Sequence, residues 1–276
     1  MAAVLHVVAT PIGNLGDLSE RARATLAAVD LVVAEDTRRT GKLLASLGID
    51  ARMRSMFEGN ERRRTDEVLA ELRDGAAVAL VSDGGTPLVS DPGYRLVRAC
   101  IDEGIDVRVV PGPSAAIAAL VVSGLPADRF VFEGFLPRNA GDRRARLAAI
   151  ADERRTVVLY ESPRRVAALL DELAAIDPDR SVAVCRELTK LHEEVRRGSV
   201  ADVRAAIGDA SVRGEVVVVL DGRSVDTPPD VDAAIAEARD LVAGGARKRE
   251  AAHRVAEHTG VPANAIYRAL VPEVAQ

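Results

Sequence analysis

Short apolar runs, rich in valine, alternate with longer amphipathic stretches through the first half of the chain. The runs cover residues 4–9, 30–34, 77–82 and 107–110. Such runs are typical of parallel strands that are buried on both faces of a sheet. The stretches between and beside them, at 18–28, 40–47, 61–74 and 93–104, have the pattern of crossover helices. This alternation predicts a doubly wound, mainly parallel α/β domain.

A second series of strand-like runs follows an apolar helix at 114–122 and a hinge-like segment at 123–128. The runs cover 130–135, 156–160, 181–187, 193–198 and 215–220. Too few residues separate the third run from the fourth for a crossover helix, so we expect antiparallel pairing and a mixed sheet.

The last part of the chain reads as a linker at 222–231 followed by three short helices. These helices are expected at 232–243, 248–258 and 262–270. The sequence therefore predicts two α/β domains and a small helical tail. The expected boundaries are 1–122, 123–222 and 223–276.

Composition limits the functions that such a fold can carry. Of the 276 residues, 48% are hydrophobic, which is enough for a sizeable core and argues against a disordered chain. The formal charge of −5 disfavours a protein that coats nucleic acid non-specifically. The chain has three Tyr, four Phe and no Trp, which disfavours a stacking platform for single-stranded bases. Taken alone, the composition argues against RNA as a partner.

Three further features bear on location. The first residues lack a basic segment and run into a Gly-containing turn, which predicts a strand rather than a signal peptide. The longest apolar stretch, Ala115 to Val122, is far below the roughly 18 residues that a membrane span needs. Cys100 and Cys185 lie far apart on apolar elements, which favours buried thiols in a reducing compartment. We therefore expect a soluble, cytoplasmic protein.

Three turns follow predicted strands at one edge of the first sheet, where ligands of α/β proteins usually bind. They are Thr10–Asp17, Val81–Gly93 and Val110–Ala116. Glycines in the first two allow the backbone to approach a ligand closely, and Asp83 is available to accept from an ammonium or a hydroxyl group. Each turn also has a purely structural interpretation, for example a helix start capped by Asp17 or Ser19.

The chemistry of these turns narrows the class of ligand. Neither the GxGxxG nor the GxxxxGK[ST] pattern is present, so nicotinamide and P-loop interpretations lose their main support. The three turns contain no basic residue, whereas a triphosphate site uses Lys or Arg and a metal. A zwitterionic ligand with a sulfonium and an adenine ring fits them better.

Eight segments of the chain, in order, carry a resemblance to a known family. They are TPIGNLGDLSERA (10–22), AEDTRRTGKLL (34–44), SDGGTPLVSDPGYRLV (82–97), PGPSAAIAAL (111–120), FEGFLPR (132–138), YESPRR (160–165), RELTKLHEE (186–194) and GEVVVVL (214–220). Together they resemble the small-subunit ribosomal RNA 2′-O-methyltransferases of the tetrapyrrole-methylase superfamily. The resemblance implies S-adenosylmethionine bound between two α/β domains, a homodimer, and methylation of a cytidine ribose in the decoding centre of 16S rRNA.

The resemblance also assigns residues to the cofactor, whereas the residues themselves show no set of metal ligands, so no metal is expected. The cofactor-binding candidates are Pro11, Gly13, Asp83, Gly84, Gly85, Thr86, Pro87, Ser114, Ala115, Tyr160, Gly214 and Glu215.

A ribose hydroxyl is a weak acid, so transfer of a methyl group to it profits from a general base. The candidates are Asp36, Glu35 and Glu161, with Asp36 preferred because it stands at a predicted strand end before Arg38 and Arg39. Each has a structural alternative. Asp36 has the position of a helix N-cap, and Glu161 stands close to Arg164 and Arg165 for ion pairing. His192 is a further candidate, with a solvated loop as its alternative.

Contact with RNA requires positive charge, and several arginine clusters offer it. The RNA-binding candidates are Arg38, Arg39, Arg62, Arg63, Arg138, Arg164, Arg247 and Lys248. The hypothesis predicts a basic rim beside the cleft and acidic residues on the opposite side; the alternative is ordinary solvated helix faces. The helical tail fits either docking to RNA within the 30S subunit or packing in the dimer.

Three functions remain open at this point. The leading one is rRNA ribose 2′-O-methylation that depends on S-adenosylmethionine. The second is methylation of a tetrapyrrole carbon, which should require a more apolar and aromatic substrate trough. The third is a non-catalytic protein that binds the cofactor or the ribosome.

Overall fold

The computed structural model of the protein describes residues 3–208, 213–223 and 231–271. The chain divides into two compact units, Met1–Arg223 and Ser224–Gln276, which we describe separately. The first unit contains two five-stranded sheets, and the second contains helices. The predicted fold class is confirmed. The boundary expected after residue 122 stays a prediction, and helix α5 (Ala115–Ser123) spans it.

The first sheet is parallel throughout and has the strand order β3-β2-β4-β1-β5. Its strands are β1 (Val4–Val8), β2 (Leu31–Ala34), β3 (Met53–Ser55), β4 (Ala77–Val81) and β5 (Asp106–Val110). The two strands β2 and β4 are completely buried, which accounts for their unbroken apolar sequences. Strand β3, a three-residue edge strand, was not predicted from the sequence.

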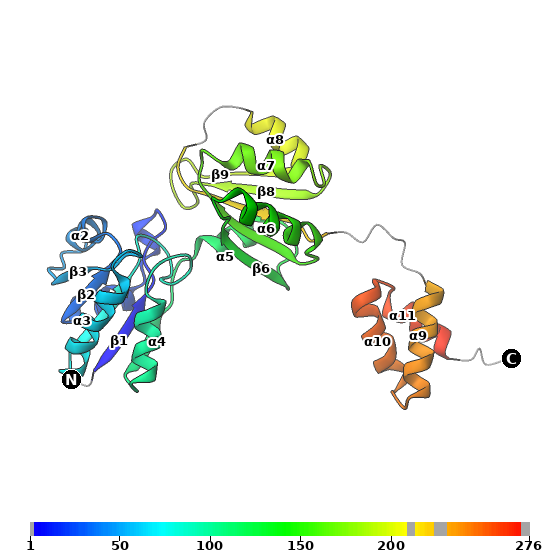
Figure 1. The fold of residues 1–276 in the computed structure, drawn as a ribbon, viewed down its shortest axis with the longest axis horizontal. Helices are drawn as coiled ribbons and strands as arrows, with labels where there is room; N and C mark the ends of the chain where they lie inside the picture. The colour runs from blue at the N-terminus through cyan, green and yellow to red at the C-terminus, as the bar shows by residue number, and fades with distance from the viewer. Residues whose placement is uncertain (1–2, 209–212, 224–230, 272–276) are drawn as a thin grey trace. The chain divides into compact units, whose positions relative to one another are not determined.

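Helices cover both faces of this sheet, as the doubly wound prediction requires (Figure 1). They are α1 (Glu20–Ala28), α2 (Thr37–Ser46), α3 (Glu61–Arg73) and α4 (Tyr94–Asp102). One core joins α3 and α4 to residues such as Leu5 and Val78, and the other joins α1 and α2 to residues such as Val32 and Ala79. Because every strand runs in the same direction, the loops that follow β1, β2 and β4 meet at one edge.

The second sheet is mixed and has the order β6-β7-β10-β8-β9. Its strands are β6 (Phe130–Phe135), β7 (Thr156–Glu161), β8 (Ser181–Arg186), β9 (Glu194–Ser199) and β10 (Val216–Leu220). The pair β6–β7 is parallel and the other pairs are antiparallel, including the predicted pair β8–β9. The register of β6 shifts between Phe132 and Gly134, so the strand carries a bulge there.

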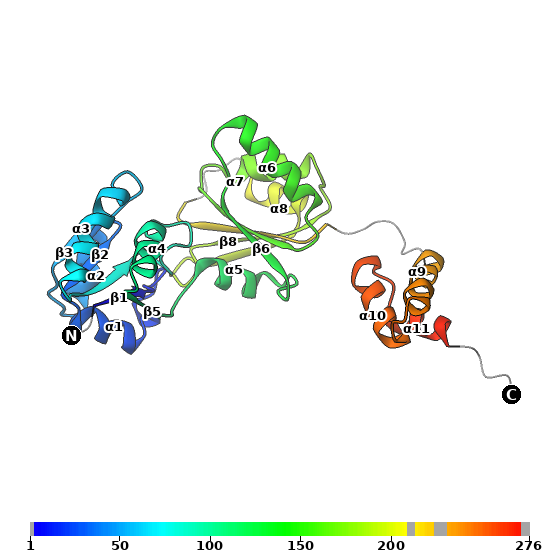
Figure 2. The same ribbon diagram turned by 60° about the horizontal axis from the view of Figure 1, so that its bottom comes forward.

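Helices α6 (Ala140–Asp152), α7 (Val166–Ala174) and α8 (Val200–Ile207) cover one face of the second sheet, and α5 covers the other (Figure 2). Alternate residues of β10 supply the two cores: Val216 and Val218 face the three helices, whereas Val217 and Val219 face α5. Helices α6, α7 and α8 were not predicted from the sequence.

In the described residues of the second unit, three helices form around a core of their own, as expected. They are α9 (Val231–Ala243), α10 (Lys248–Thr259) and α11 (Ala263–Leu270). Small residues such as Ala234 and Ala252 bring the helices together, and Ile266 of α11 is completely buried between them. Across the described ranges, no helix has both the length and the apolarity needed to cross a membrane.

Candidate active site

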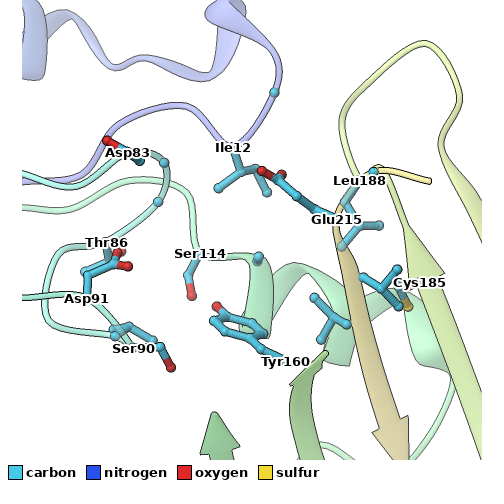
Figure 3. A pocket seen from close by; sticks show the side chains of 18 of the residues that line it. Ile12, Asp83, Thr86, Ser90, Asp91, Ser114, Tyr160, Cys185, Leu188 and Glu215 are labelled. Atoms are coloured by element: carbon cyan, nitrogen blue, oxygen red, sulfur yellow. The ribbon is translucent and has the colours of Figure 1, made fainter. Parts of the chain in front are cut away.

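A cavity of about 620 Å³ lies in the first unit, between the strand-end loops of the first sheet and the second sheet. The loops after β1, β2 and β4 and the start of α5 form one wall, and segments of β6, β7, β8 and β10 form the other. The volume is within the roughly 300–1,000 Å³ that small-molecule sites occupy. Figure 3 shows labelled side chains from both walls facing this space.

Backbone hydrogen bonds hold two of the three predicted turns together. Thr10 N–H donates to the Gly85 carbonyl at 2.9 Å, and Gly85 N–H donates to the Thr10 carbonyl at 3.0 Å. Gly85 has a φ of +93°, which favours glycine. A Cβ atom on Gly84 would lie 3.2 Å from the Pro11 carbonyl oxygen, so the two turns are closely packed. They therefore act as one continuous wall.

The third turn joins the same wall through side chains. The Thr86 hydroxyl donates to the Pro113 carbonyl at 3.0 Å. Tyr160 lies at the base of the cavity, where its ring meets Phe132 and Phe135 edge-on with centroid separations of 5.0 and 5.5 Å. Burial raises the pKa of the Tyr160 hydroxyl. This end of the cavity is thus aromatic, with one hydroxyl directed toward Ser114 (Figure 3).

On the opposite wall, a lysine links two glutamates. The Lys190 ammonium lies 2.7 Å from Glu187 Oε1 and 2.9 Å from Glu215 Oε2. Gly214, at φ +90°, leaves no room for a side chain, because a Cβ atom there would overlap the Glu187 carboxylate. The ion pairs fix the Gly214–Glu215 segment against the β8–β9 loop.

The structure brings most of the predicted cofactor residues together. Eleven of the twelve line the cavity, and Pro87 does not. Their assignment to a cofactor stays a prediction, but their position on one surface follows from the parallel strands of the first sheet and the strand-end segments of the second.

Asp36 does not line this cavity and is held by its neighbours. It is the N-cap of α2, where its carboxylate accepts from Arg38 N–H at 2.8 Å. The Arg38 guanidinium also donates to it, at 2.6 and 3.0 Å, and holds the Asp36 pKa far below its usual range. This is the capping role that the sequence analysis left as the alternative.

Glu161 lines the cavity, but its oxygens are already used. The side chain is completely buried and pairs with Arg165 at 2.6 Å and with Arg143 at 3.4 Å. It also accepts from Ser162 N–H at 2.6 Å. Arg143 continues to Glu172, so Glu161 belongs to a four-residue ionic network.

Glu35 is the predicted carboxylate that both lines the cavity and is free of an ion pair within the described ranges. Its pKa is raised, first by burial and then by the charge of Asp83. Asp83 itself accepts from Arg39 at 3.1 Å and from Asp36 N–H at 3.0 Å. Glu35 therefore fits the role of a proton acceptor better than Asp36 or Glu161.

Most arginines of the stretch 52–64 are paired within the chain, whereas, among the described residues, most of the RNA-binding candidates are not. Arg52 and Arg54 pair with Glu71, and Arg63 and Arg64 pair with Glu67. Of the RNA-binding candidates, Arg39 lines the cavity and Arg38 is bound to Asp36. Ion pairs within 4 Å are absent, as far as the structure describes the chain, for Arg62, Arg138, Arg164, Arg247 and Lys248. Among the described residues that line the cavity, the basic side chains are Arg39 and Lys190, and both are ion-paired. A wider basic rim beside the cavity stays a prediction.

A second, smaller cavity of about 300 Å³ lies on the other side of Arg39. Side chains of α2 line it, including Arg39, Lys42 and Ser46, together with the turn after β1. Arg39 and Asp83 line both cavities, so the two adjoin.

Several cavity residues were not named as candidates from the sequence. They are Ser90, Asp91, Phe135, Cys185, Leu188, Lys190, Val216 and Val217, among others. Asp91 lies within the second predicted turn, where two non-glycine residues, Leu88 and Ser90, have positive φ angles of 72° and 68°. Strained backbone of this kind concentrates at functional sites, but φ angles cannot be read from the sequence.

The remaining polar features complete the site. Cys100 and Cys185 are free and buried, as expected, and burial raises the pKa of each thiol to about 11. Within the described residues, no group of three or more His, Cys, Asp or Glu side chains has the arrangement of a metal site.

Known proteins with similar sequences place the chain in a family. The sequence profile described as Tetrapyrrole (Corrin/Porphyrin) Methylases matches residues 4–204. The chain is 48% identical over 267 residues to "Ribosomal RNA small subunit methyltransferase I" of Mycobacterium tuberculosis, covering 95% of this chain and 93% of that protein. The proteins of the same name from Synechocystis and Escherichia coli are 44% and 43% identical, each covering 96% of this chain and 96% and 93% of the relative.

The chain belongs to this methyltransferase family. Solved tetrapyrrole methylases share its fold at low sequence identity. The methyltransferase CobJ superimposes with a TM-score of 0.62 at 19% identity, over 82% of this chain and 97% of that one. Uroporphyrin-III C-methyltransferase from Thermus thermophilus, complexed with S-adenyl homocysteine, gives 0.56 at 22% identity, over 80% and 97%.

Proposed function

We propose that this protein transfers a methyl group from S-adenosylmethionine to a ribose 2′-hydroxyl of small-subunit rRNA, at a cytidine of the decoding centre. The observation that carries the proposal is the cavity between the strand-end loops of the first sheet and the second sheet. It lies in a chain whose relatives at 43–48% identity are named as small-subunit rRNA methyltransferases. S-adenosylmethionine supplies an activated methyl group, so the protein's main tasks are alignment and exclusion of water.

The residues present fit this cofactor. The cavity has peptide groups of glycine turns on one wall and an aromatic base formed by Tyr160 and Phe135. Its two cations, Arg39 and Lys190, are already paired with carboxylates, while Glu35 and Asp91 have no ion pair in the described part of the chain. The wall therefore carries uncompensated negative charge, which favours a ligand with a sulfonium charge over a phosphate-bearing one. Pro11, Gly13, Asp83–Thr86, Ser114, Ala115, Tyr160, Gly214 and Glu215 would hold it.

The acceptor RNA would approach past Arg39. The adjoining 300 Å³ cavity places Lys42 and Ser46 next to Arg39, so a phosphate neighbouring the target ribose meets two cationic side chains there. Recognition of a structured RNA by a few such contacts is compatible with an overall charge of −5. Arg247 is the N-cap of α10 in the second unit and Lys248 is its first residue. Both side chains would add contacts to RNA phosphates.

The homodimer is also part of the proposal. Ile117 and Val121 lie four residues apart on α5 and are 47% and 72% exposed. An exposed apolar pair on an otherwise apolar helix favours burial against a second copy. Sedimentation of Val121→Glu against the unchanged chain tests this, and an unchanged oligomeric state would remove α5 from the interface.

The test of the function is transfer of a labelled methyl group to three acceptors: intact 30S subunits, free 16S rRNA and a tetrapyrrole. We expect label in a cytidine nucleotide whose 3′ bond resists alkali, because a methylated 2′-oxygen cannot attack the neighbouring phosphate. Label on the tetrapyrrole alone, or no label in ribose from either ribosomal substrate, would contradict the proposal. Comparison of 30S with free rRNA identifies the natural acceptor.

A further inference from the structure

We propose that Asp91 is a catalytic residue: its carboxylate receives the proton of the attacking 2′-hydroxyl. The proposal rests on the proposed function and adds to it a proton acceptor that the sequence motifs did not single out. Asp91 lies on the wall formed by the β4–α4 loop, beside Thr86 and Ser90 and facing the cavity (Figure 3).

The loop that carries Asp91 is held in an unusual conformation. Leu88 and Ser90 have left-handed backbone angles, which cost about 1–3 kcal/mol each for non-glycine residues unless the surroundings enforce them. The surroundings do so at both ends. The Thr86 hydroxyl is tied to Pro113, and Glu61 Oε1 accepts from the N–H groups of Gly93 and Arg95, each at 3.0 Å. The position of Asp91 is therefore imposed by the fold.

The second sheet also makes room for this loop. Gly134, at the bulge of β6, has a φ of +62°, and a Cβ atom there would lie 2.8 Å from the Ser90 hydroxyl oxygen. The bulge and the missing side chain allow Ser90 to approach the second sheet, and Asp91 follows it into the cavity wall. Two independent features of the fold thus direct one carboxylate into the site.

Asp91 is available, unlike most carboxylates around it. Asp36 is held by Arg38, Glu161 by Arg165 and Arg143, and Asp83 by Arg39. Glu187 and Glu215 share Lys190. Within the described ranges, no basic side chain comes within 4 Å of the Asp91 carboxylate, and its polar neighbour is the Ser82 hydroxyl. Its oxygens are therefore free to accept a proton from a substrate.

The groups that face Asp91 make it a stronger base than an ordinary aspartate. Burial raises its pKa to about 6, and the charges of Glu35 and Asp83 contribute, while Ser82 acts in the opposite direction. Tyr160 faces it from the second sheet and is neutral in this range, since its own pKa is raised. Asp91 is thus ionised at neutral pH yet holds a proton far better than Asp36. A base with a pKa near the working pH is the most effective kind.

The proton and electrons of the transfer step are all accounted for. The hydroxyl oxygen forms the new bond to the methyl carbon as its O–H bond breaks, and the proton passes to an Asp91 oxygen. The electron pair of the broken S–C bond remains on sulfur, so the sulfonium charge is lost as Asp91 is neutralised. Asp91 then releases the proton to water. The charge of Glu35, on the same wall, raises the Asp91 pKa and so favours uptake of the proton during methyl transfer.

The decisive experiment compares Asp91→Asn and Asp91→Glu with Asp74→Asn, a control at an exposed aspartate outside the cavity. Single-turnover methylation of 30S subunits is measured from about pH 5 to 9, and affinity for S-adenosylhomocysteine by calorimetry. We expect Asp91→Asn to lose about 10²–10⁴-fold in rate and to bind S-adenosylhomocysteine within about threefold of the unchanged protein. The rate of the unchanged protein should fall below about pH 6, which forms the acidic limb of its pH–rate profile. The profile of Asp91→Asn should lack this acidic limb.

Other results would overturn the proposal. An Asp91→Asn rate within about tenfold of the unchanged protein would show that the proton goes elsewhere. Loss of S-adenosylhomocysteine binding by more than about tenfold would make Asp91 a cofactor ligand instead. Asp91→Glu keeps a carboxylate, so its rate should still fall at low pH even if the rate is lower throughout. A rate of Asp91→Glu that does not fall at low pH would contradict the assignment. The unchanged protein's label in ribose tests the proposed function, and the ratio of variant to unchanged rate tests Asp91, so the two failures are distinguishable.

Discussion

The two walls of the cavity treat negative charge in opposite ways. On the second-sheet wall, each glutamate has a basic partner: Glu161 has Arg165 and Arg143, and Glu215 has Lys190. On the first-sheet wall, Asp83 is paired with Arg39, but Glu35 and Asp91 have no basic partner among the described residues, and both have raised pKa values. Charge on the second wall stabilises structure, whereas charge on the first is left for ligand and chemistry. A carboxylate's role in this site is set by whether the fold gives it a cation.

The largest effect on stability should come from Glu161→Gln, on the second-sheet wall. The change removes the charge that two arginines share, and Arg143 is only 12% exposed. Breaking a buried pair from one side typically costs about 3–5 kcal/mol, and Glu172, which remains bonded to Arg143, places the expected loss near the lower value. Urea unfolding measures it. A loss of less than about 1 kcal/mol would mean that the network is not structural and that Glu161 is free for catalysis.

The next largest effect tests the geometry of that wall. Gly214→Ala places a Cβ atom against the Glu187 carboxylate at a φ of +90°, so we expect a strain of about 1–3 kcal/mol and roughly tenfold weaker S-adenosylhomocysteine binding. Gly208→Ala is the matched control, because Gly208 also has a positive φ but nothing lies within 4 Å of its Cβ position. Equal cofactor affinity in the two variants would remove Gly214 from the cofactor site.

Sequence reasoning found the fold and most of the cavity for a local reason. Strand runs and the turns that follow them are contiguous in sequence, and parallel strands bring such turns to one edge. It did not find β3, which has three residues and is held in the sheet by pairing with β2. It did not single out Asp91, because that residue's properties come from burial, from Glu35 on another strand end and from a bulge in β6. Pairing partners distant in sequence are also hard to predict, as the pairs of Arg52 and Arg54 with Glu71 show.

On the first-sheet wall, removal of the Asp91 charge should stabilise the protein. A carboxyl whose folded pKa is about 6, against an ordinary 3.8, binds its proton more tightly in the folded state. Its ionisation therefore lowers the free energy of unfolding as pH rises from about 4 to about 6, and the penalty is complete above that range. These two pKa values correspond to about 3 kcal/mol, and screening by solvent lowers the penalty because Asp91 is half-buried. Asp91→Asn should therefore be more stable than the unchanged protein by about 1–2 kcal/mol at about pH 8 and equal to it near pH 4. A stability difference that does not depend on pH would show that Asp91 carries no such penalty.

The smallest effect is expected at Asp36, which separates capping from catalysis most directly. Asparagine caps helices as well as aspartate does, so Asp36→Asn should keep the start of α2 and change the thermal midpoint by no more than about 2 °C. Arg38 holds the Asp36 pKa far below neutral pH, which makes this carboxylate a weak proton acceptor. Methylation of 30S subunits should therefore stay within about threefold of the unchanged rate, with the same acidic limb. A loss comparable to that of Asp91→Asn, with S-adenosylhomocysteine binding intact, would return the role of base to Asp36. It would also show that an ion-paired carboxylate outside the cavity can leave its partner when RNA binds.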